Sequence, residues 1–253
     1  MSGARAEILS AVRQALGRGR LDPAAEAALR VRVAAHRRNL VPARATALDR
    51  AGRIDLFVAM AEGVQATVTR VASPAAVPAA VVQYLAAENL PADLVMAPDP
   101  GLDAIPWHSR PLLQLRRGPA EPADAVSLTP CFAAVAETGT LMLVSGADTP
   151  TTLNFLPDTH IAVVRADQVV ATYEEGWDRL RAAVPGEAAG ARLPRTVNFI
   201  TGPSRTGDIE QRIVLGAHGP RRLHIVVIDD PASDGRGQGQ DGEDGCEGPA
   251  AAG

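Results

Sequence analysis

The chain has 253 residues, of which 46% are hydrophobic and 21% charged, and its formal net charge is -4 at pH 7. A chain of this size buries a substantial core, and its slightly acidic balance argues against nucleic acid or an anionic membrane surface as a partner. The 25 strongly basic residues are all arginine. The absence of lysine excludes a Schiff-base lysine, a lysine general base and the lysine of a phosphate-binding P-loop.

Residues 1–45 predict a helical amino-terminal appendage. The first helix places four apolar side chains on one side, namely Ile8, Leu9, Val12 and Leu16. A second helix is expected to begin at Asp22-Pro23, an N-cap acid followed by proline at the first helical position, and to reach Arg38. No signal peptide and no apolar run long enough to span a bilayer is visible, so we expect a cytoplasmic protein.

Residues 46–230 predict one α/β domain in which helices and strands alternate. Residues 56–62 are expected to form the last part of one helix. Three further helices are expected at 75–87, 131–136 and 173–184. Strands are expected at 66–71, 94–97, 125–128, 140–144, 161–164, 197–200 and 223–228, with a short edge piece at 169–170. The nearly continuous apolar strands favour a mainly parallel sheet flanked by helices.

The last segment, residues 231–253, is composed mostly of Gly, Asp, Gln, Ala and Pro. Such a composition buries too little apolar surface to offset its ordering entropy, so we expect a disordered tail. Its cysteine, Cys246, is distant from the other one, Cys131. A disulfide framework is therefore implausible, and so is an iron–sulfur cluster held by four thiolates of this chain.

A first polar cluster, Glu137-Thr138-Gly139-Thr140, leads into an expected strand. Glycine lets a backbone approach a ligand closely or adopt a positive φ, and Glu137 would stand beside exposed amides and two hydroxyls. The alternative is a helix that ends in a C-cap glycine, with a solvated glutamate.

The second cluster centres on His160, which follows a proline turn and immediately precedes an apolar strand. Histidine titrates near neutral pH, so His160 is a candidate general acid or base, or a contact for an anion. The alternative is a hydrogen-bonded histidine that fixes the loop.

The third cluster, Thr201 to Glu210, follows an expected strand and gathers three hydroxyls, one arginine and two carboxylates. A short helix is expected here, starting near Ser204 and Thr206, and helix starts bind phosphate or carboxylate through unpaired N–H groups. Arg205 would add a bidentate contact. Alternatively, Ser204 or Thr206 caps the helix and Asp208 complements its dipole. The two carboxylates, Asp208 and Glu210, would repel an anion.

His218 lies in a Gly-His-Gly-Pro turn, where the flanking glycines make the backbone permissive. A triad of Ser204, His218 and Asp208 has no support from spacing, because triads are recognised by geometry. No short metal-ligand spacing is present among the histidines and carboxylates, so no metal is expected.

Taken together, these clusters resemble the lactate-utilisation (LUD) domain family, specifically its LutC-type members. The matching motifs are Ala136-Glu-Thr-Gly-Thr140, Leu156-Pro157 with His160, Thr201-Gly-Pro-Ser-Arg-Thr206 with Asp208-Ile-Glu210, and His218-Gly-Pro220. One stretch departs from the family pattern: Thr129-Pro-Cys-Phe-Ala-Ala-Val135 replaces a Gly-Ala-rich approach to the first motif. This departure leaves open whether the entrance of the pocket and its ligand match those of the usual members.

The resemblance implies a fold like that of the sugar-phosphate isomerase and CoA-transferase superfamily. It also implies a non-cluster subunit of a complex that oxidises L-lactate to pyruvate, alongside an iron–sulfur LutB-type subunit and a cysteine-rich LutA-type subunit. The clusters would lie in those partners, with no cofactor bound by this chain. Its expected catalytic residues are Glu137, His160 and His218, and its expected substrate-binding residues are Thr138, Gly139, Thr140, Ser204, Arg205, Thr206, Asp208 and Glu210.

Two other functions stay open at this point, and so does the question of whether the chain is an enzyme. One is a stand-alone transferase or isomerase that uses Glu137 as nucleophile or base and holds a small carboxylate or phosphate near Ser204. The other is a scaffold without pocket chemistry, in which the arginine-rich amino-terminal helices dock a partner by complementary charge.

Overall fold

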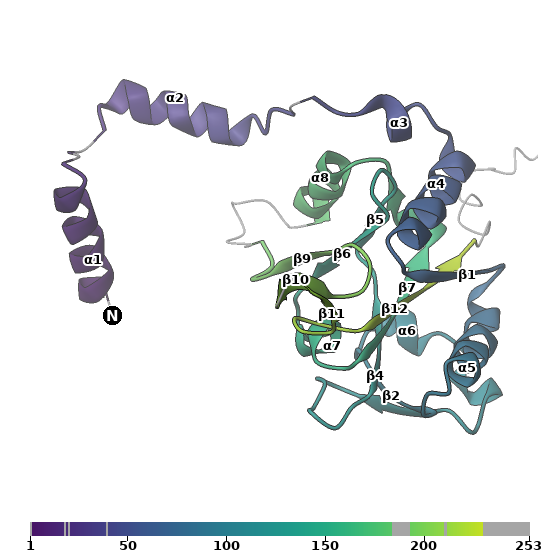
Figure 1. Ribbon diagram of the computed structural model, residues 1–253. Coiled ribbons are helices and arrows are strands. Elements are labelled where there is room, and N and C mark those ends of the chain that lie inside the picture. The colour runs from purple at the N-terminus through teal and green to yellow at the C-terminus, as the bar shows by residue number, and fades with distance from the viewer. Residues whose placement is uncertain are drawn as a thin grey trace, which may run out of the picture. The chain divides into compact units, whose positions relative to one another are not determined.

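The computed structural model describes residues 2–17, 19, 21–38, 40–183, 193–209 and 212–229 (Figure 1). The chain divides into two compact units, Met1–Val41 and Pro42–Gly253. The expected tail at 231–253 and its cysteine, Cys246, lie outside the described residues.

The first unit contains the helices α1 (Ser2–Ala15) and α2 (Pro23–Ala34). Asp22 caps α2 as expected, because its carboxylate accepts hydrogen bonds from Ala24 N and Ala25 N, each at 3.1 Å. The helix ends at Ala34 rather than at Arg38. None of the described helices in either unit is long and apolar enough to cross a membrane.

The second unit is built on a six-stranded sheet in the order β1-β12-β7-β4-β2-β3, in which every neighbouring pair is parallel. The strands are β1 (Thr67–Val71), β2 (Asp93–Met96), β3 (Gln114–Arg117), β4 (Val126–Pro130), β7 (Thr159–Arg165) and β12 (Arg222–Ile228). The inner strands β7 and β12 are buried over six of their seven residues. The fold is therefore α/β with a mainly parallel central sheet, as the sequence predicts.

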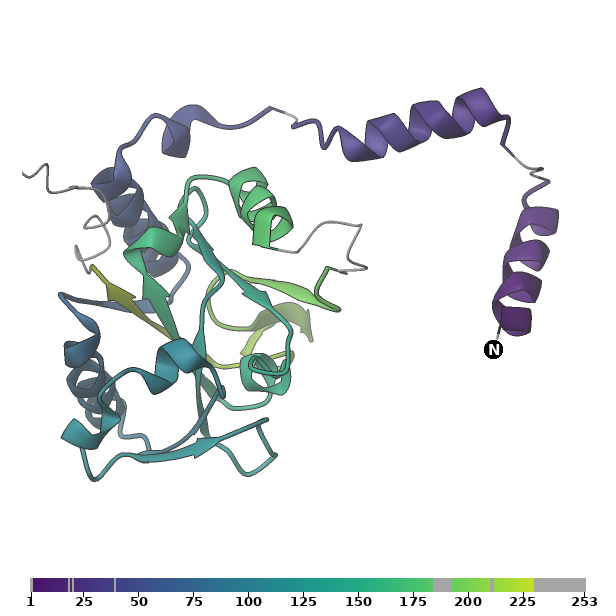
Figure 2. The ribbon, with the colours of Figure 1, turned by 180° about the vertical axis from the view of Figure 1, so that it is seen from behind.

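The two faces of this sheet pack against different partners because side chains alternate along each strand. On β12, Val226 and Ile228 join a core with α5 (Val77–Ala87) and α6 (Pro100–Asp103). Ile225 and Val227 join a second core with α4 (Arg50–Gly63) and with a smaller sheet. Figure 2 shows the ribbon from behind, so that α6 lies in front of the main sheet. The remaining short helices are α3 (Ala43–Thr46), α7 (Thr152–Phe155) and three 3-10 turns at Pro74–Ala76, Trp107–Ser109 and Ala166–Gln168.

The smaller sheet has four strands in the order β8-β5-β6-β9, and it was not expected as a separate layer. Its strands are β5 (Ala133–Val135), β6 (Thr140–Val144), β8 (Val169–Val170) and β9 (Val197–Ile200). One face packs on the main sheet, and the other packs Ala133 and Met142 against Leu180 of α8 (Tyr173–Ala183). The helix predicted at 131–136 is wrong, because this alanine-rich segment pairs with β6 and β8 as β5.

The helix expected after Ser204 is also wrong. Residues Arg205–Ile209 form β10, which pairs antiparallel with β11 (Arg212–Leu215) in a hairpin. Ser204 N donates to Pro220 O at 2.8 Å, and Gly216 N donates to Ser204 O at 3.0 Å, so the backbone of Ser204 closes the base of this hairpin. Ser204 therefore does not offer a helix N-terminus to an anion.

Two glycines at positive φ bring turns against the last turns of α4. Gly139 has φ +65, and a Cβ there would lie 2.3 Å from Ala61 N. Gly202 has φ +73, and a Cβ there would lie 2.3 Å from Val64 O. Only glycine fits both conditions, so these two turns and α4 are positioned by the same close backbone contacts.

Candidate functional site

A cavity of about 290 Å³, here called the hairpin cavity, lies at the amino ends of two central strands. His160 and Leu223, the second residues of β7 and β12, contribute to its wall. The turns before β10 and after β11 supply further lining residues, including Ser204, Arg205 and His218. The structure thus brings His160, Ser204, Arg205 and His218 together, although they are far apart in the sequence.

His160 is fully buried and uses one of its two ring nitrogens within the protein. Its Nε2 lies 2.7 Å from Thr129 Oγ1, whereas Nδ1 has no hydrogen-bond partner among the described residues. Burial lowers the pKa of His160 from 6.5 to about 4, so the imidazole is neutral at pH 7. A buried polar atom without a partner is rare, and here its side chain lines a cavity, which suits a ligand hydrogen bond.

The turn residues Ser204 and His218 are joined by a hydrogen bond from His218 N to Ser204 Oγ at 3.2 Å. Arg205 is exposed, and its Nη1 donates to Gln65 Oε1 at 3.2 Å. A guanidinium has five N–H donors, so this contact leaves Arg205 the capacity to bind a carboxylate at the mouth of the cavity.

Three residues of the third sequence cluster are placed less fully. Thr206 follows Arg205 in β10 and does not line the hairpin cavity. Asp208 lies in the same strand, in a part where side chains are not described, and Glu210 lies outside the described residues.

Glu137 lines neither the hairpin cavity nor the second cavity described below. It is 7% exposed, and its Oε1 accepts a hydrogen bond from Tyr173 N, the first residue of α8, at 3.4 Å. Its carbonyl oxygen accepts from Arg44 Nη2. A carboxylate at this position complements the positive end of the helix dipole, which gives Glu137 a structural explanation.

The hydroxyls of the first cluster form a partly buried network with Tyr173. Thr138 Oγ1 lies 2.7 Å from Thr140 Oγ1, and both threonines are hydrogen-bonded to the Tyr173 hydroxyl, at 3.0 and 2.9 Å. Thr140 Oγ1 also lies 2.7 Å from Thr201 Oγ1. Because Thr201 lines the hairpin cavity, Thr138 and Thr140 support the cavity wall through Thr201. Gly139, between them, contacts α4.

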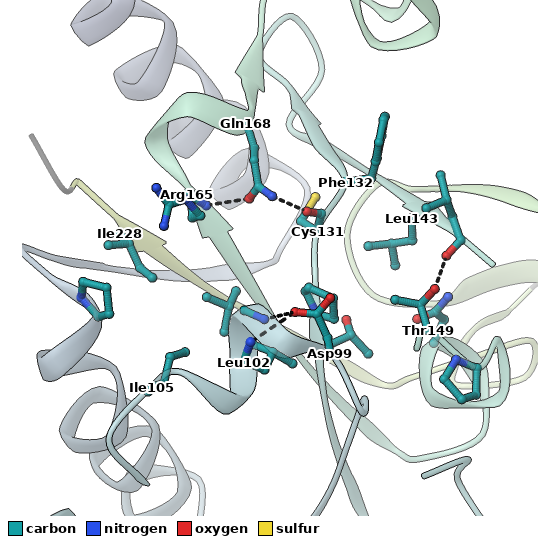
Figure 3. A pocket seen from close by; sticks show the side chains of 18 of the residues that line it. Asp99, Leu102, Ile105, Cys131, Phe132, Leu143, Thr149, Arg165, Gln168 and Ile228 are labelled. Atoms are coloured by element: carbon teal, nitrogen blue, oxygen red, sulfur yellow. Dashed lines mark hydrogen bonds between the residues drawn. The ribbon is translucent and has the colours of Figure 1, made fainter. Parts of the chain in front are cut away.

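A second cavity of about 310 Å³, here called the strand-end cavity, lies at the carboxyl ends of the main sheet (Figure 3). Thr129, Val163 and Ile228 line it from the carboxyl halves of β4, β7 and β12. In open α/β sheets, ligands bind at this edge. Asn154 lines both cavities, and Thr129 connects them through its hydrogen bond to His160.

The strand-end cavity contains Cys131, which is not a reactive thiol. Its Sγ donates to Ala133 O at 2.9 Å, and the residue is 2% exposed. Burial raises the pKa of the Cys131 thiol to about 12, so the thiol is protonated at neutral pH. Nucleophilic chemistry from Cys131 is therefore disfavoured.

Sequence reasoning missed four residues that the geometry brings to these sites, namely Thr129, Asn154, Tyr173 and Arg179. Two of them had a signal in the sequence, because the departure at 129–135 covers Thr129 and the polar cluster around His160 begins at Asn154. Within the part of the chain that the structure describes, no cluster of three or more histidine, cysteine and carboxylate side chains is suited to a metal ion.

Comparison with known families matches residues 115–228 to the model of the LUD domain. This range contains three complete strands of the main sheet, β4, β7 and β12, together with the strand residues that line both cavities and all three polar clusters. The matched range begins within β3 and ends with the last residue of β12.

The chain is similar to two curated relatives named "Lactate utilization protein C". That from Deinococcus radiodurans is 46% identical over 107 residues, which cover 42% of this chain and 47% of the relative. That from Bacillus subtilis (strain 168) is 35% identical over 111 residues, or 44% of this chain and 45% of the relative. The chain thus spans about half the length of the curated relatives it matches.

A solved structure supports the fold across a larger part of the chain. The crystal structure of a DUF162 family protein from Deinococcus radiodurans aligns with a TM-score of 0.53 and 29% sequence identity. The alignment covers 72% of this chain and 99% of that one. The second unit therefore has the architecture of a known family of folded domains.

Proposed function

Because this chain belongs to the LUD domain family and is of the LutC type, we propose that it acts in lactate utilisation as the non-cluster subunit of an L-lactate-oxidising iron–sulfur complex. The observation that carries this proposal is the 46% identity to a relative named "Lactate utilization protein C". The LUD-type motifs that the sequence analysis identifies lie within the same domain.

The chain's own chemistry supports a subunit that does not carry electrons. Of its two cysteines, Cys131 is buried, protonated and hydrogen-bonded to backbone oxygens. Oxidation of lactate to pyruvate releases two electrons and two protons, and these electrons would pass to clusters in LutB-type and LutA-type partners.

The hairpin cavity is the proposed place for lactate. Arg205 at its mouth is suited to the carboxylate, and the neutral imidazole of His160 is suited to the 2-hydroxyl group. If His160 Nε2 donates to Thr129 Oγ1, Nδ1 carries a lone pair that accepts the lactate hydroxyl proton in a hydrogen bond. His218 and Ser204 close the side of the cavity formed by the hairpin base.

Growth on L-lactate as sole carbon source tests the role in the cell. The chain is expected to restore growth to a bacterium that lacks its own Lactate utilization protein C, and to co-purify with the iron–sulfur subunits. The isolated chain should show no visible absorbance and no lactate dehydrogenation. Failure to restore growth with a well-expressed chain, or a strong flavin or cluster spectrum from the isolated chain, would contradict the proposal.

Calorimetric titration with L-lactate tests the site. Arg205→Met is expected to weaken L-lactate binding about tenfold or more, since it removes a charge-assisted contact. Arg110→Met is the matched control, because Arg110 is an exposed arginine that lines neither cavity and has the same charge. Equal affinities in both variants would remove Arg205 and the hairpin cavity from the proposal.

A further inference from the structure

The strand-end cavity has an apolar interior that is not explained by lactate binding. Its walls come from both layers: Leu102 belongs to α6 and Ile105 follows it, Val163 and Ile228 lie in the carboxyl halves of β7 and β12, and Leu143 belongs to β6. Figure 3 shows Leu102, Ile105, Leu143 and Ile228 arranged around a common space, with Phe132 on one side. A cavity of about 310 Å³ is within the range that holds small organic ligands.

Two arginines and one glutamine enter the lining from η3 (Ala166–Gln168), from its N-cap and from α8, whereas Asp99, Thr129, Thr149 and Asn154 supply polar groups elsewhere on the wall. Gln168 is held in place, because its Nε2 donates to Cys131 O at 2.6 Å and its Oε1 accepts from Arg165 N at 2.8 Å (Figure 3). Arg165 is exposed and forms an ion pair with Asp167 at 3.1 Å. Arg165 is solvent-exposed, so water screens its attraction for an anionic ligand.

Arg179 is the better-placed cation. It is half-buried on α8, its Nη1 donates to Asp167 O at 2.6 Å, and its guanidinium lies 5.9 Å from the centre of the Phe132 ring. The backbone contact and the ring fix the guanidinium beside the apolar lining. A guanidinium has five N–H donors, so the contact with Asp167 O leaves Arg179 the capacity to bind an anionic group. A fixed cation next to an apolar cavity favours a ligand that has an anionic group and an apolar body.

We propose that the strand-end cavity is a second ligand site, which binds a small organic acid with an apolar body and places its anionic group against Arg179. The ligand differs in kind from lactate, because a body with several carbons is needed to cover Leu102, Ile105 and Leu143. Cys131 contributes to the wall and takes no covalent part, since its proton is held by Ala133 O.

The test uses octanoate as the probe and octanol as its uncharged counterpart, each titrated calorimetrically into the full chain. Octanoate is expected to bind the parent chain, and Arg179→Met to weaken it about tenfold or more. Octanol affinity should not change in Arg179→Met, because only the anionic group meets the guanidinium. Arg181→Met is the matched control on the same helix, since Arg181 pairs with Asp178 and does not line the cavity.

A second variant, Leu143→Trp, adds bulk to the cavity from the face of β6 that packs toward the main sheet and is expected to abolish octanoate binding. A circular dichroism melt establishes that each variant is folded. Absence of octanoate binding to the parent chain, equal weakening by Arg179→Met and Arg181→Met, or unchanged binding in Leu143→Trp would each overturn the proposal.

L-lactate separates this proposal from the proposed function. Arg179→Met should bind L-lactate like the parent chain, and Arg205→Met should bind octanoate like the parent chain. If the chain binds octanoate but fails to restore growth on L-lactate, the lactate role alone is refuted.

Discussion

At the scale of single residues, His160 has the most unusual environment among the residues singled out from the sequence. It is fully buried, yet only Thr129 satisfies one of its ring nitrogens. His224, on the adjacent strand β12, resembles it: Nδ1 lies 2.8 Å from Thr67 Oγ1, Nε2 has no partner among the described residues, and the ring stacks on Tyr84. Both imidazoles are therefore stable in the fold only when neutral.

This burial predicts acid sensitivity. Burial lowers the pKa of both His160 and His224 from 6.5 to about 4. Between these values the unfolded chain binds more protons than the folded one, so the free energy of unfolding falls as pH falls from 6.5 towards 4. A complete shift of this size is worth roughly 3 kcal/mol per histidine at most.

Urea denaturation at pH 7 and pH 5 measures the effect. His160→Gln should lose less stability between these two pH values than the parent chain does, whereas the exposed control His108→Gln should match the parent chain. An unchanged pH dependence in His160→Gln would show that the imidazole of His160 is not desolvated.

The sequence identified His160 as a candidate because a histidine at the start of an apolar strand is unusual. It did not identify Thr129, since the contact depends on the register between β4 and β7, where Ser127 rather than Thr129 lies opposite His160. Glu137 illustrates the opposite limit: its motif suggested chemistry, and its carboxylate instead lies at the start of α8. Its expected catalytic role stays a prediction.

At the scale of elements, α4 is fixed by the two glycine turns. A side chain at Gly139 would have to enter the backbone of Met60 and Ala61, at 2.5 and 2.3 Å, in a left-handed conformation. The turn can accommodate that side chain only if α4 moves. Phe57 and Ala61 of α4 are buried in the core between the sheets, so such a movement would disturb this core. The hydroxyl network next to Gly139 would move with it.

Gly139→Ala is therefore expected to lower the free energy of unfolding by roughly 3 kcal/mol, from left-handed strain and steric overlap. Gly63→Ala is the matched control at the end of α4, where a Cβ meets nothing within 4 Å. It should raise stability by roughly 0.5 kcal/mol. Urea denaturation measures both, and equal effects would show that the turn relaxes without cost.

The strands and long helices with strong apolar patterns were predictable, because their burial follows from local periodicity. The segments at 131–136 and 204–210 were not. Alanine-rich β5 has a high intrinsic helix propensity, which pairing with β6 and β8 overrides. The hairpin is closed by Pro220, beyond the reach of a local pattern that starts at Ser204.

At the scale of the whole molecule, β12 joins the beginning and the end of the second unit. It pairs with β1 on one side and with β7 on the other, so both halves of the main sheet depend on it. Edge strand β3 differs, because it pairs only with β2. Gln114 N donates to Ala92 O and Gly118 N to Met96 O, so the intervening Leu115 N–H points away from β2.

Proline substitutions should separate these two positions. Val226→Pro in β12 is expected to lower the free energy of unfolding by about 3 kcal/mol or more, because the ring removes a donor within a strand paired on both sides. Leu115→Pro in β3 should cost much less, since no ladder bond is lost. Urea denaturation followed by circular dichroism compares them, and equal losses would contradict the strand order.

The parallel main sheet was predictable as a class from its alternating elements, whereas the division into two sheets was not. A run of apolar residues predicts a buried strand, but it does not say which of two layers the strand joins. The strand-end cavity depends on that division, because Leu143 of β6 and Phe132, which precedes β5, line it together with the ends of the main-sheet strands.

The contacts of Gly139 and Gly202 with one helix have a consequence for ancestry. Both turns rest on neighbouring backbone atoms of α4, from Met60 to Val64. A lineage that gained a side chain at either glycine would displace the helix and so alter the other turn. We therefore expect substitutions at Gly139, at Gly202 and in the last turns of α4 to be coupled in evolution, so that a change at one of these places is accompanied by changes at the others.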